Sequence, residues 1–154
     1  MNYVVRRQHV AARHLAVVRD HRSWSRLGGQ LLPLLDRVYA EVRAGRIAKA
    51  GHNVFVYRDA TADEVTVEVG VEVASPYSGV DAVTDASTPA GEVVTTVHVG
   101  DYARLGRAYE ALIAWCDERR VTRAGIWWEV YGDWNEDPSL VETEVFHLLR
   151  TDGR

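Results

Sequence analysis

The clearest hydrophobic pattern in the chain is the alternation in residues 64–73, EVTVEVGVEV. Valines occupy the odd positions from 65 to 73, and glutamate, threonine and glycine fill the even ones. Because successive side chains of a strand point to opposite faces, this pattern predicts a strand with one buried and one solvated face. The apolar residues of HLAVVRD (14–20) and EVVTTVHV (92–99) predict two more β-rich segments.

Two other segments have a helical period. In residues 102–116 the apolar positions recur at i, i+3, i+4 and i+7, which puts them on one helix face; they are Tyr102, Leu105, Tyr109, Leu112, Ile113 and Cys116. Asp101 or Gly100 is expected to cap the start of this helix. Residues 24–42 carry a similar stripe, in which Pro33 lacks a backbone donor and is expected to kink or restart the helix.

An internal repeat organises these elements, because three pairs of segments align in the same order. The pairs are WSRLGGQLLPLL (24–35) with YARLGRAYEALI (102–113), GHNVFVYRD (51–59) with GIWWEVYGD (125–133), and VTVEVGV (65–71) with VETEVFH (141–147). Their offsets of 78, 74 and 76 residues differ only by short loop changes. Each half therefore has the predicted order β-α-β-β.

The repeat predicts the domain organisation and an α+β fold class. We expect a single domain over 1–154, with a first repeat at about 1–74, a Ser-, Gly-, Pro- and Asp-rich linker at about 75–90, and a second repeat at about 91–150. Two duplicated units with pseudo-twofold symmetry would form a mixed or antiparallel sheet with two helices on one face. The gap between the helices is then a natural central pocket.

Composition and charge exclude several classes of function. A chain of 154 residues that is 47% hydrophobic suits one compact domain. The chain begins with arginines where a secretory signal is apolar, and no apolar run approaches the roughly 20 residues that span a bilayer, so we expect a cytoplasmic protein with no membrane partner. The net charge of −4, the scattered basic residues and the lack of helix-turn-helix or zinc-finger spacing argue against direct nucleic-acid binding.

Residue types that usually carry metal or cofactor chemistry are sparse. The single cysteine, Cys116, excludes an internal disulfide and a multi-cysteine zinc site, and its helical surroundings indicate a packing residue. The six histidines show no metal-ligand spacing. The Gly28-Gly29 pair lies within the predicted helix and lacks the lysine of a phosphate-binding loop. We therefore expect no metal and no cofactor.

The stretch GIWWEVYGDW (125–134) has the pattern of a buried strand but contains one carboxylate, Glu129. A carboxylate among aromatic residues is costly unless a partner satisfies it. Strand alternation places Trp127, Glu129 and Tyr131 on one face and Trp128 on the other. The chemistry that this sequence offers is therefore centred on a buried acid with aromatic neighbours.

Short motifs of the second half occur in the order of a known family. The motifs are H-x-G-x-Y at His98, Gly100 and Tyr102, E-x-Y at Glu129 and Tyr131, and E-T-E-V at 142–145. With the helix between them and the duplication, they resemble the GyrI-like small-molecule-binding domain, which is also the effector-binding domain of AraC-type regulators such as Rob and of MerR-type regulators such as BmrR. In this chain no DNA-binding domain accompanies it, and Pro33 is not part of the family pattern.

This resemblance implies a duplicated β-α-β-β fold with a central pocket for small, amphipathic, often cationic or aromatic molecules, and an acidic pocket residue at Glu129. In the aligned first half, Phe55 stands at the place of Glu129 and Tyr57 at that of Tyr131. Strand alternation and the family's pocket together give these candidate ligand-binding residues: Glu129, Trp127, Tyr131, Tyr57, Phe55, Tyr109 and His147.

The physical chemistry of such a site favours a cation. A partly desolvated carboxylate attracts a cation strongly, and aromatic ring faces add on the order of 0.5–2 kcal/mol per contact. Because burial disfavours a charged carboxyl group, we hypothesise that Glu129 is neutral without ligand and ionises when a cation binds.

Structural roles are the alternative for the same residues. Glu129 would then face solvent or pair with Arg58 or Arg123, and Tyr109 would be core. His147 is either a hydrogen-bonded core residue or a polar group of the pocket. Packing, structural or solvent-facing roles are also expected for Tyr102, Trp24, His98, Trp128, Glu142 and Glu144.

Three classes of function remain, of which binding of a small amphipathic molecule for sensing, sequestration or drug resistance is favoured. The second is a hydrolase that opens strained electrophilic rings of natural products, with Glu129 as general base and Tyr131 or Tyr57 as acid. No Ser-His-Asp, metal or phosphate-loop signature accompanies them. The third is a protein-binding, gyrase-inhibitor-like role, which predicts an exposed apolar patch, with Trp134 as the candidate. The identity of the ligand and a homodimer are left open.

Overall fold

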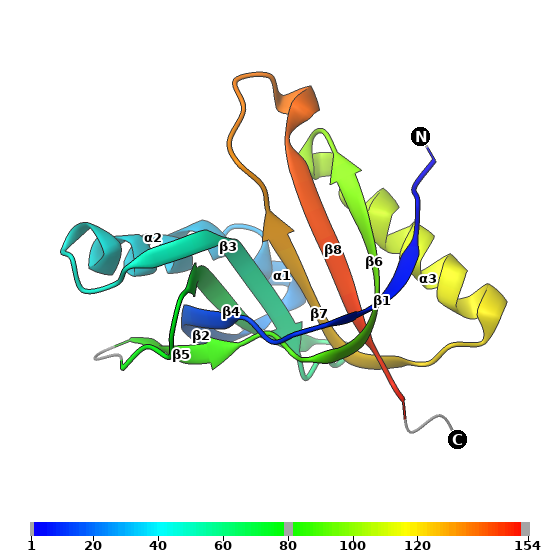
Figure 1. Ribbon diagram of the computed structural model, residues 1–154, viewed down its shortest axis with the longest axis horizontal. Helices are drawn as coiled ribbons and strands as arrows, with labels where there is room; N and C mark the ends of the chain where they lie inside the picture. The colour runs from blue at the N-terminus through cyan, green and yellow to red at the C-terminus, as the bar shows by residue number, and fades with distance from the viewer. Residues whose placement is uncertain (1, 79–81, 152–154) are drawn as a thin grey trace. The chain divides into compact units, whose positions relative to one another are not determined.

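A computed structural model describes residues 2–78 and 82–151 of the chain (Figure 1). This described part contains eight β-strands, three α-helices and two short 3-10 helices, and its described strand pairs are antiparallel. The predicted α+β class is therefore confirmed. The chain divides into two compact units: a first unit of Ala12–Thr88, and a second unit of Met1–Ala11 with Pro89–Arg154.

The first unit consists of four strands and two helices. Its elements in chain order are β2 (His14–Ser23), α1 (Trp24–Leu27), α2 (Leu31–Arg43), β3 (Lys49–Arg58), β4 (Glu64–Val73) and β5 (Val83–Ser87). The strands lie in the order β3-β4-β2-β5. Leu34, Leu35 and Val38 are the buried residues of α2, which packs against β2 and β4.

A turn at residues 28–30 interrupts the helix that the sequence predicts over 24–42. Pro33 lies in the first turn of α2, where backbone N–H groups have no acceptor within the helix. Its missing donor therefore costs little, and the helix restarts ahead of the proline. The Gly28-Gly29 pair, which we expected inside the helix, belongs to the turn.

The segment predicted as a linker, about 75–90, contains the strand β5, which pairs antiparallel with β2 along its whole length. Just beyond β5, the Thr88 hydroxyl accepts a hydrogen bond from the Arg13 backbone N–H at 2.9 Å. The Ser, Asp and Thr residues of this segment give no alternating pattern, and strand formation here follows from backbone pairing with a partner already in place. Residues 79–81 of the predicted linker lie outside the described residues.

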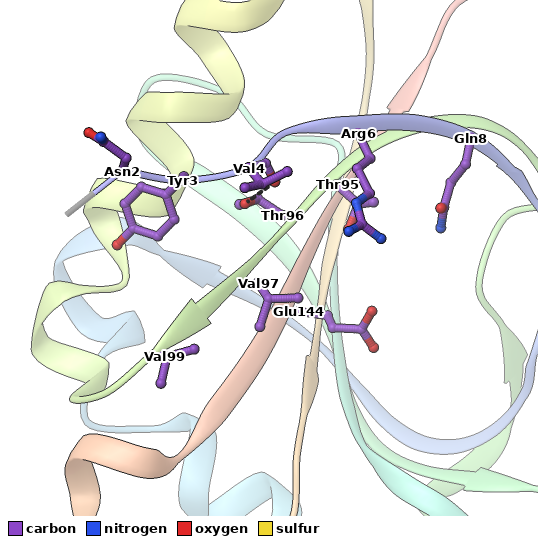
Figure 2. Close-up of a pocket in the computed structure, with 10 residues that line it drawn as sticks. All are labelled: Asn2, Tyr3, Val4, Arg6, Gln8, Thr95, Thr96, Val97, Val99 and Glu144. Carbon is purple, nitrogen blue, oxygen red and sulfur yellow. Dashed lines mark hydrogen bonds between the residues drawn. The ribbon is translucent and has the colours of Figure 1, made fainter.

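The second unit has the same succession of strand, helix, strand and strand. Its elements are β1 (Arg6–Val10), β6 (Gly91–Val99), the 3-10 helix η1 (Tyr102–Arg104), α3 (Gly106–Arg119), β7 (Arg123–Tyr131), the 3-10 helix η2 (Pro138–Leu140) and β8 (Glu142–Leu149). The strands lie in the order β1-β6-β8-β7. Figure 2 shows the N-terminal residues leading into β1 beside β6. The Asp101 carboxylate accepts the Ala103 N–H at 2.9 Å and so caps η1, whereas α3, the helix that Asp101 was expected to cap, begins later, at Gly106.

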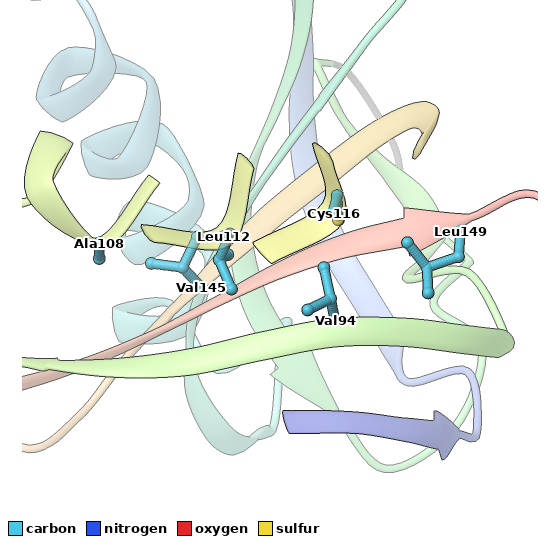
Figure 3. Packing of buried hydrophobic residues seen from close by; sticks show 6 residues of the cluster. All are labelled: Val94, Ala108, Leu112, Cys116, Val145 and Leu149. Atoms are coloured by element: carbon cyan, nitrogen blue, oxygen red, sulfur yellow. The ribbon is translucent and has the colours of Figure 1, made fainter. Parts of the chain in front are cut away.

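The core of the second unit lies between α3 and the strands β6 and β8 (Figure 3). Its buried members are Val94, Ala108, Leu112, Cys116, Val145 and Leu149. Burial raises the pKa of the Cys116 thiol, which disfavours the reactive thiolate. Cys116 is therefore a packing residue of the helix, as its place on the apolar stripe predicts.

The two units pair their strands at matching residues. Phe55 pairs with Val69 in the first unit, and Glu129 pairs with Val145 in the second. These partners differ by 74 and 76 positions, the offsets of the sequence alignment. Each ladder also has an irregularity at the start, between 49 and 53 in the first unit and between 123 and 127 in the second. Phe55 of β3 and Glu129 of β7 therefore each lie opposite a buried valine of the following strand in their own unit.

The solvated face that the alternating pattern predicts for β4 is wrong at its centre. Glu68 is only 2% exposed, because Arg19 and Arg58 from the neighbouring strands bind its carboxylate. The Arg19 Nε and terminal nitrogen lie 2.7 and 2.6 Å from Oε2, and a terminal nitrogen of Arg58 lies 2.8 Å from Oε1. At Gly70, a Cβ atom would meet the Ala16 carbonyl oxygen at 1.9 Å, so the close approach of β2 requires glycine.

Candidate ligand-binding site

Glu129 is a buried carboxylate held by two tyrosines of its own unit. It is 5% exposed, and it lies on β7 facing α3. The Tyr109 hydroxyl, from the middle of α3, donates to Oε2 at 2.5 Å, and the Tyr131 hydroxyl donates to Oε1. Tyr131 follows Glu129 by two residues and so shares its face of the strand. The sequence therefore places one donor by strand alternation and the other by the helical stripe.

The structure bears on two structural alternatives for Glu129. A solvent-facing carboxylate is wrong, because the side chain is buried. Arg58, one of the two arginines considered as partners, binds Glu68 in the first unit. The hydrogen bonds described for Glu129 come from Tyr109 and Tyr131, and phenols hold a carboxylate in place without adding a positive charge.

His147 lies beside the same tyrosine. It pairs with Trp127 across the β7–β8 ladder, and the two rings stack with centroids 5.7 Å apart and planes at 26°. The Tyr109 ring meets it edge to face at 5.7 Å and 88°. His147 is 5% exposed, and within the described residues neither of its ring nitrogens has a hydrogen-bond partner. The hydrogen-bonded core role that we considered for His147 is therefore not what the structure shows.

The imidazole of His147 is neutral at neutral pH. Burial lowers its pKa from 6.5 to about 4, and the positive charge of Arg123 acts in the same direction. A neutral imidazole presents one N–H donor and one bare nitrogen acceptor. The site thus combines a carboxylate with a neutral group that can both donate and accept a hydrogen bond.

Five of the seven predicted ligand-binding residues lie in the second unit, where each side chain contacts the next in a continuous series. We call these residues the Glu129 cluster: Trp127, His147, Tyr109, Glu129 and Tyr131. The other two, Phe55 and Tyr57, are buried on β3 in the first unit. They share a strand face with Asn53, which accepts a hydrogen bond from Tyr39 of α2 at 2.5 Å. In each unit, the predicted site residues therefore lie on the face that the helix covers.

Tyr102 adds an exposed ring to this cluster. We expected it to be core, but it is 53% exposed and meets the Tyr131 ring edge to face at 5.5 Å and 78°. The reason is that Tyr102 begins the separate turn η1, ahead of α3, and does not lie on the helix itself. The Asp101 cap is the sequence signal that marks this early break. Tyr102 and Tyr131 thus link the buried carboxylate to the surface of the second unit.

Other residues singled out in the sequence have structural contacts. Trp128 stacks on Phe146 on the opposite face of the strands, with centroids 5.2 Å apart and planes at 9°. His98 is hydrogen-bonded through both ring nitrogens, to the Tyr3 hydroxyl and to the Asp101 carbonyl, each at 2.8 Å. Trp134 is 80% exposed in the segment between β7 and β8.

A separate hollow of about 490 Å³ lies on the strand face away from α3 (Figure 2). Its polar lining includes Arg6 of β1, Thr95 of β6 and Glu144 of β8, and Val97 adds apolar surface. Glu144 pairs with Val130, so its side chain and that of Glu129 point to opposite faces. This hollow is therefore not part of the Glu129 cluster.

Two kinds of feature are absent from the described part of the chain, metal-ligand clusters and long apolar helices. It contains no group of three or more His, Cys, Asp or Glu residues placed to hold a metal ion. None of its helices is long and apolar enough to cross a membrane.

Comparison with solved structures identifies the fold. The C-terminal domain of EcmrR matches with a TM-score of 0.76 and 19% identity, over 97% of this chain and 99% of that domain. SAV2435, in a structure bound to tetraphenylphosphonium, matches with a TM-score of 0.67 and 10% identity, over 98% of this chain and 95% of that protein. The chain has the GyrI-like fold. This is the fold that the resemblance of its motifs predicts.

Two further solved structures also match the fold. A structure described as a hydrolase encoded by lin2189 from Listeria innocua also matches, with a TM-score of 0.61 and 9% identity, over 95% of this chain and 91% of that protein. In the EcmrR–DNA complex, the match covers 57% of the EcmrR chain. No protein-family model matches the sequence. No curated protein matches it either.

Proposed function

We propose that this protein binds a small amphipathic molecule with an aromatic body and a positive charge, and that Glu129 binds the charged end. The observation that carries the proposal is the buried carboxylate held by two neutral phenols. The tetraphenylphosphonium bound in SAV2435, an aromatic cation in a protein of the same fold, supports it. The role would be sensing or sequestering the compound.

The geometry suits attraction of a cation. Away from bulk water, a carboxylate attracts an opposite charge more strongly than it does at the surface. The tyrosine hydroxyls fix the carboxylate before ligand arrives, which reduces the ordering cost of binding. The aromatic rings of Trp127, Tyr109 and Tyr131 supply faces for stacking and cation–π contact.

Hydrolysis is the second candidate, favoured by the hydrolase from Listeria innocua with the same fold. Mass spectrometry of any bound compound after incubation separates the two functions, because only a hydrolase changes its mass.

The duplication that the repeat predicts also belongs to this proposal. We infer that the two units are copies of one β-α-β-β module, because their strands pair at equivalent residues. In that case the acid is an addition to one copy, since Phe55 keeps the apolar residue at the same place.

The test is a calorimetric titration with tetraphenylphosphonium of the unchanged protein and of two variants. Glu129→Gln keeps the shape of the side chain but removes its charge, and we expect at least about tenfold weaker binding. Glu144→Gln is the matched control, because it removes a carboxylate of the same unit from the opposite strand face. It should bind within about twofold of the unchanged protein. Equal losses in both variants would contradict a role for Glu129.

A further inference from the structure

The two ring nitrogens of His147 are buried polar atoms with no hydrogen-bond partner in the described residues. Buried polar groups in folded proteins are nearly always hydrogen-bonded, and each exception calls for an explanation. The ring itself is well fixed, because Trp127 stacks on it and Tyr109 packs against it edge to face. A rigid, unsatisfied imidazole is what a site needs when the hydrogen-bond partner is a ligand.

His147 lies at the same tyrosine ring as the acid. The Tyr109 hydroxyl donates to Glu129, and the edge-to-face contact of the Tyr109 ring is with His147. Glu129 and His147 lie on the strand face that α3 covers, and Tyr109 reaches both of them from α3. A cationic group with more than one N–H-bearing nitrogen, such as an amidinium, can therefore donate to Glu129 with one nitrogen and approach the imidazole across the Tyr109 ring with the other.

The protonation state of His147 fits this role. Its pKa, lowered to about 4 by burial and by Arg123, leaves the ring neutral near pH 7, so it does not repel a cation bound at Glu129. The neutral ring offers one donor and one acceptor. It therefore matches a ligand that carries an N–H or O–H group, or an acceptor, beside its aromatic body.

We propose that His147 makes this site select aromatic cations that carry their own hydrogen-bonding groups, such as aromatic amidinium ions, over onium ions that carry none. The inference rests on the proposed function, because it assigns a second subsite beside Glu129. Its physical basis is asymmetric: a site built to hydrogen-bond a ligand loses affinity for an analogue that leaves its buried polar group unpaired.

The experiment compares two probes, biphenyl-4-carboxamidine, which has N–H donors, and tetraphenylphosphonium, which has no hydrogen-bonding group. His147→Phe keeps a flat ring but removes both nitrogens. It should weaken amidine binding about tenfold and change tetraphenylphosphonium binding by less than about twofold. His147→Gln retains a donor and an acceptor and should recover a large part of the amidine affinity. Glu129→Gln should weaken binding of both probes.

The outcomes separate the two proposals. If the protein binds neither probe, or if Glu129→Gln weakens neither, the proposed function fails and the role of His147 fails with it. If Glu129→Gln weakens both probes but His147→Phe affects them equally or not at all, only the role of His147 is overturned.

A spectroscopic measurement on the unchanged protein guards against a variant that does not fold. In protein labelled with ¹⁵N at histidine, the His147 ring nitrogens should shift when the amidine binds, because a hydrogen bond forms there. They should shift little with tetraphenylphosphonium. Ring nitrogens that do not respond to bound amidine would overturn the inference.

Discussion

Two buried glutamates, one in each unit, show how differently the same sheet can treat a carboxylate. Glu68 of the first unit is bound by the guanidinium groups of Arg19 and Arg58. Glu129 of the second unit accepts hydrogen bonds from two tyrosine hydroxyls. The guanidinium partners cancel the charge of Glu68 within the protein, whereas phenols only orient the carboxylate of Glu129. The first arrangement pairs the carboxylate with two cationic side chains, and the second includes two neutral donors.

The strand register within each unit shows which neighbouring residues make this difference. In the second unit Glu144 corresponds to Glu68, and Val97 lies opposite it where Arg19 lies opposite Glu68. Without that guanidinium, Glu144 is only half-buried and lines an open hollow. On the helix-covered face, the second unit has Glu129 on β7 and the first unit has the aromatic Phe55 on β3. The buried carboxylate of the second unit thus lies on the helix-covered face, whereas Glu68 lies on the opposite face of its own strands.

The largest effect is expected from removing the partners of Glu68. The double variant Arg19→Met with Arg58→Met leaves a buried carboxylate without its cations and should lower the free energy of unfolding by about 3–5 kcal/mol. Adding Glu68→Met should restore most of the loss, because an apolar residue then fills the place of the charge. Urea denaturation measures both. A double variant as stable as the unchanged protein would remove the structural role from this ion cluster.

Part of this comparison is predictable from the sequence, because strand alternation puts Glu129 and Tyr131 on one face of β7, where the two side chains are hydrogen-bonded. The burial of Glu68 is not predictable in this way. Alternation assigns it to the polar face of β4, and the arginines that bury it are distant in sequence. The lack of a hydrogen-bond partner for the His147 ring nitrogens was missed for a similar reason, because it depends on which polar groups the folded chain brings near the ring.

The second expected effect concerns pH and the Glu129 cluster. Because the pKa of His147 is lowered to about 4 in the folded protein, the unfolded chain takes up this proton first as the pH falls below about 6.5. The free energy of unfolding should therefore decrease between about pH 6.5 and pH 4, and His147 should account for about 3 kcal/mol of the decrease. Above pH 7 the residue has no such effect.

Urea denaturation at pH 7 and at pH 4 measures this decrease, with His147→Phe as the reference. Other groups titrate in the same range, but they are common to both proteins, so the difference between the two decreases belongs to His147. If the variant loses as much stability on acidification as the unchanged protein, His147 is not buried in its neutral form.

A smaller effect is expected at the phenols that orient Glu129. Tyr109→Phe and Tyr131→Phe each remove one hydrogen bond to a buried carboxylate, and each should lower the free energy of unfolding by about 2 kcal/mol. Both should also weaken tetraphenylphosphonium binding, because the carboxylate is less well fixed. Tyr39→Phe, which loses a hydrogen bond to an uncharged amide in the first unit, is the control and should cost less. Equal losses at all three tyrosines would indicate that the charge of Glu129 plays no part.

The smallest effect on stability is expected at Trp134. A variant at this position also shows which tryptophans report ligand binding by fluorescence. This side chain is 80% exposed, so Trp134→Phe should change the free energy of unfolding by less than about 0.5 kcal/mol. Removing it should abolish a red-shifted component of the fluorescence that iodide quenches, because exposed indoles emit at longer wavelength. The emission that remains comes from more buried tryptophans, among them Trp127 beside His147.

Ligand quenching that persists undiminished in this variant would report on the Glu129 cluster. Quenching that disappears with Trp134 would instead place the ligand at the segment between β7 and β8.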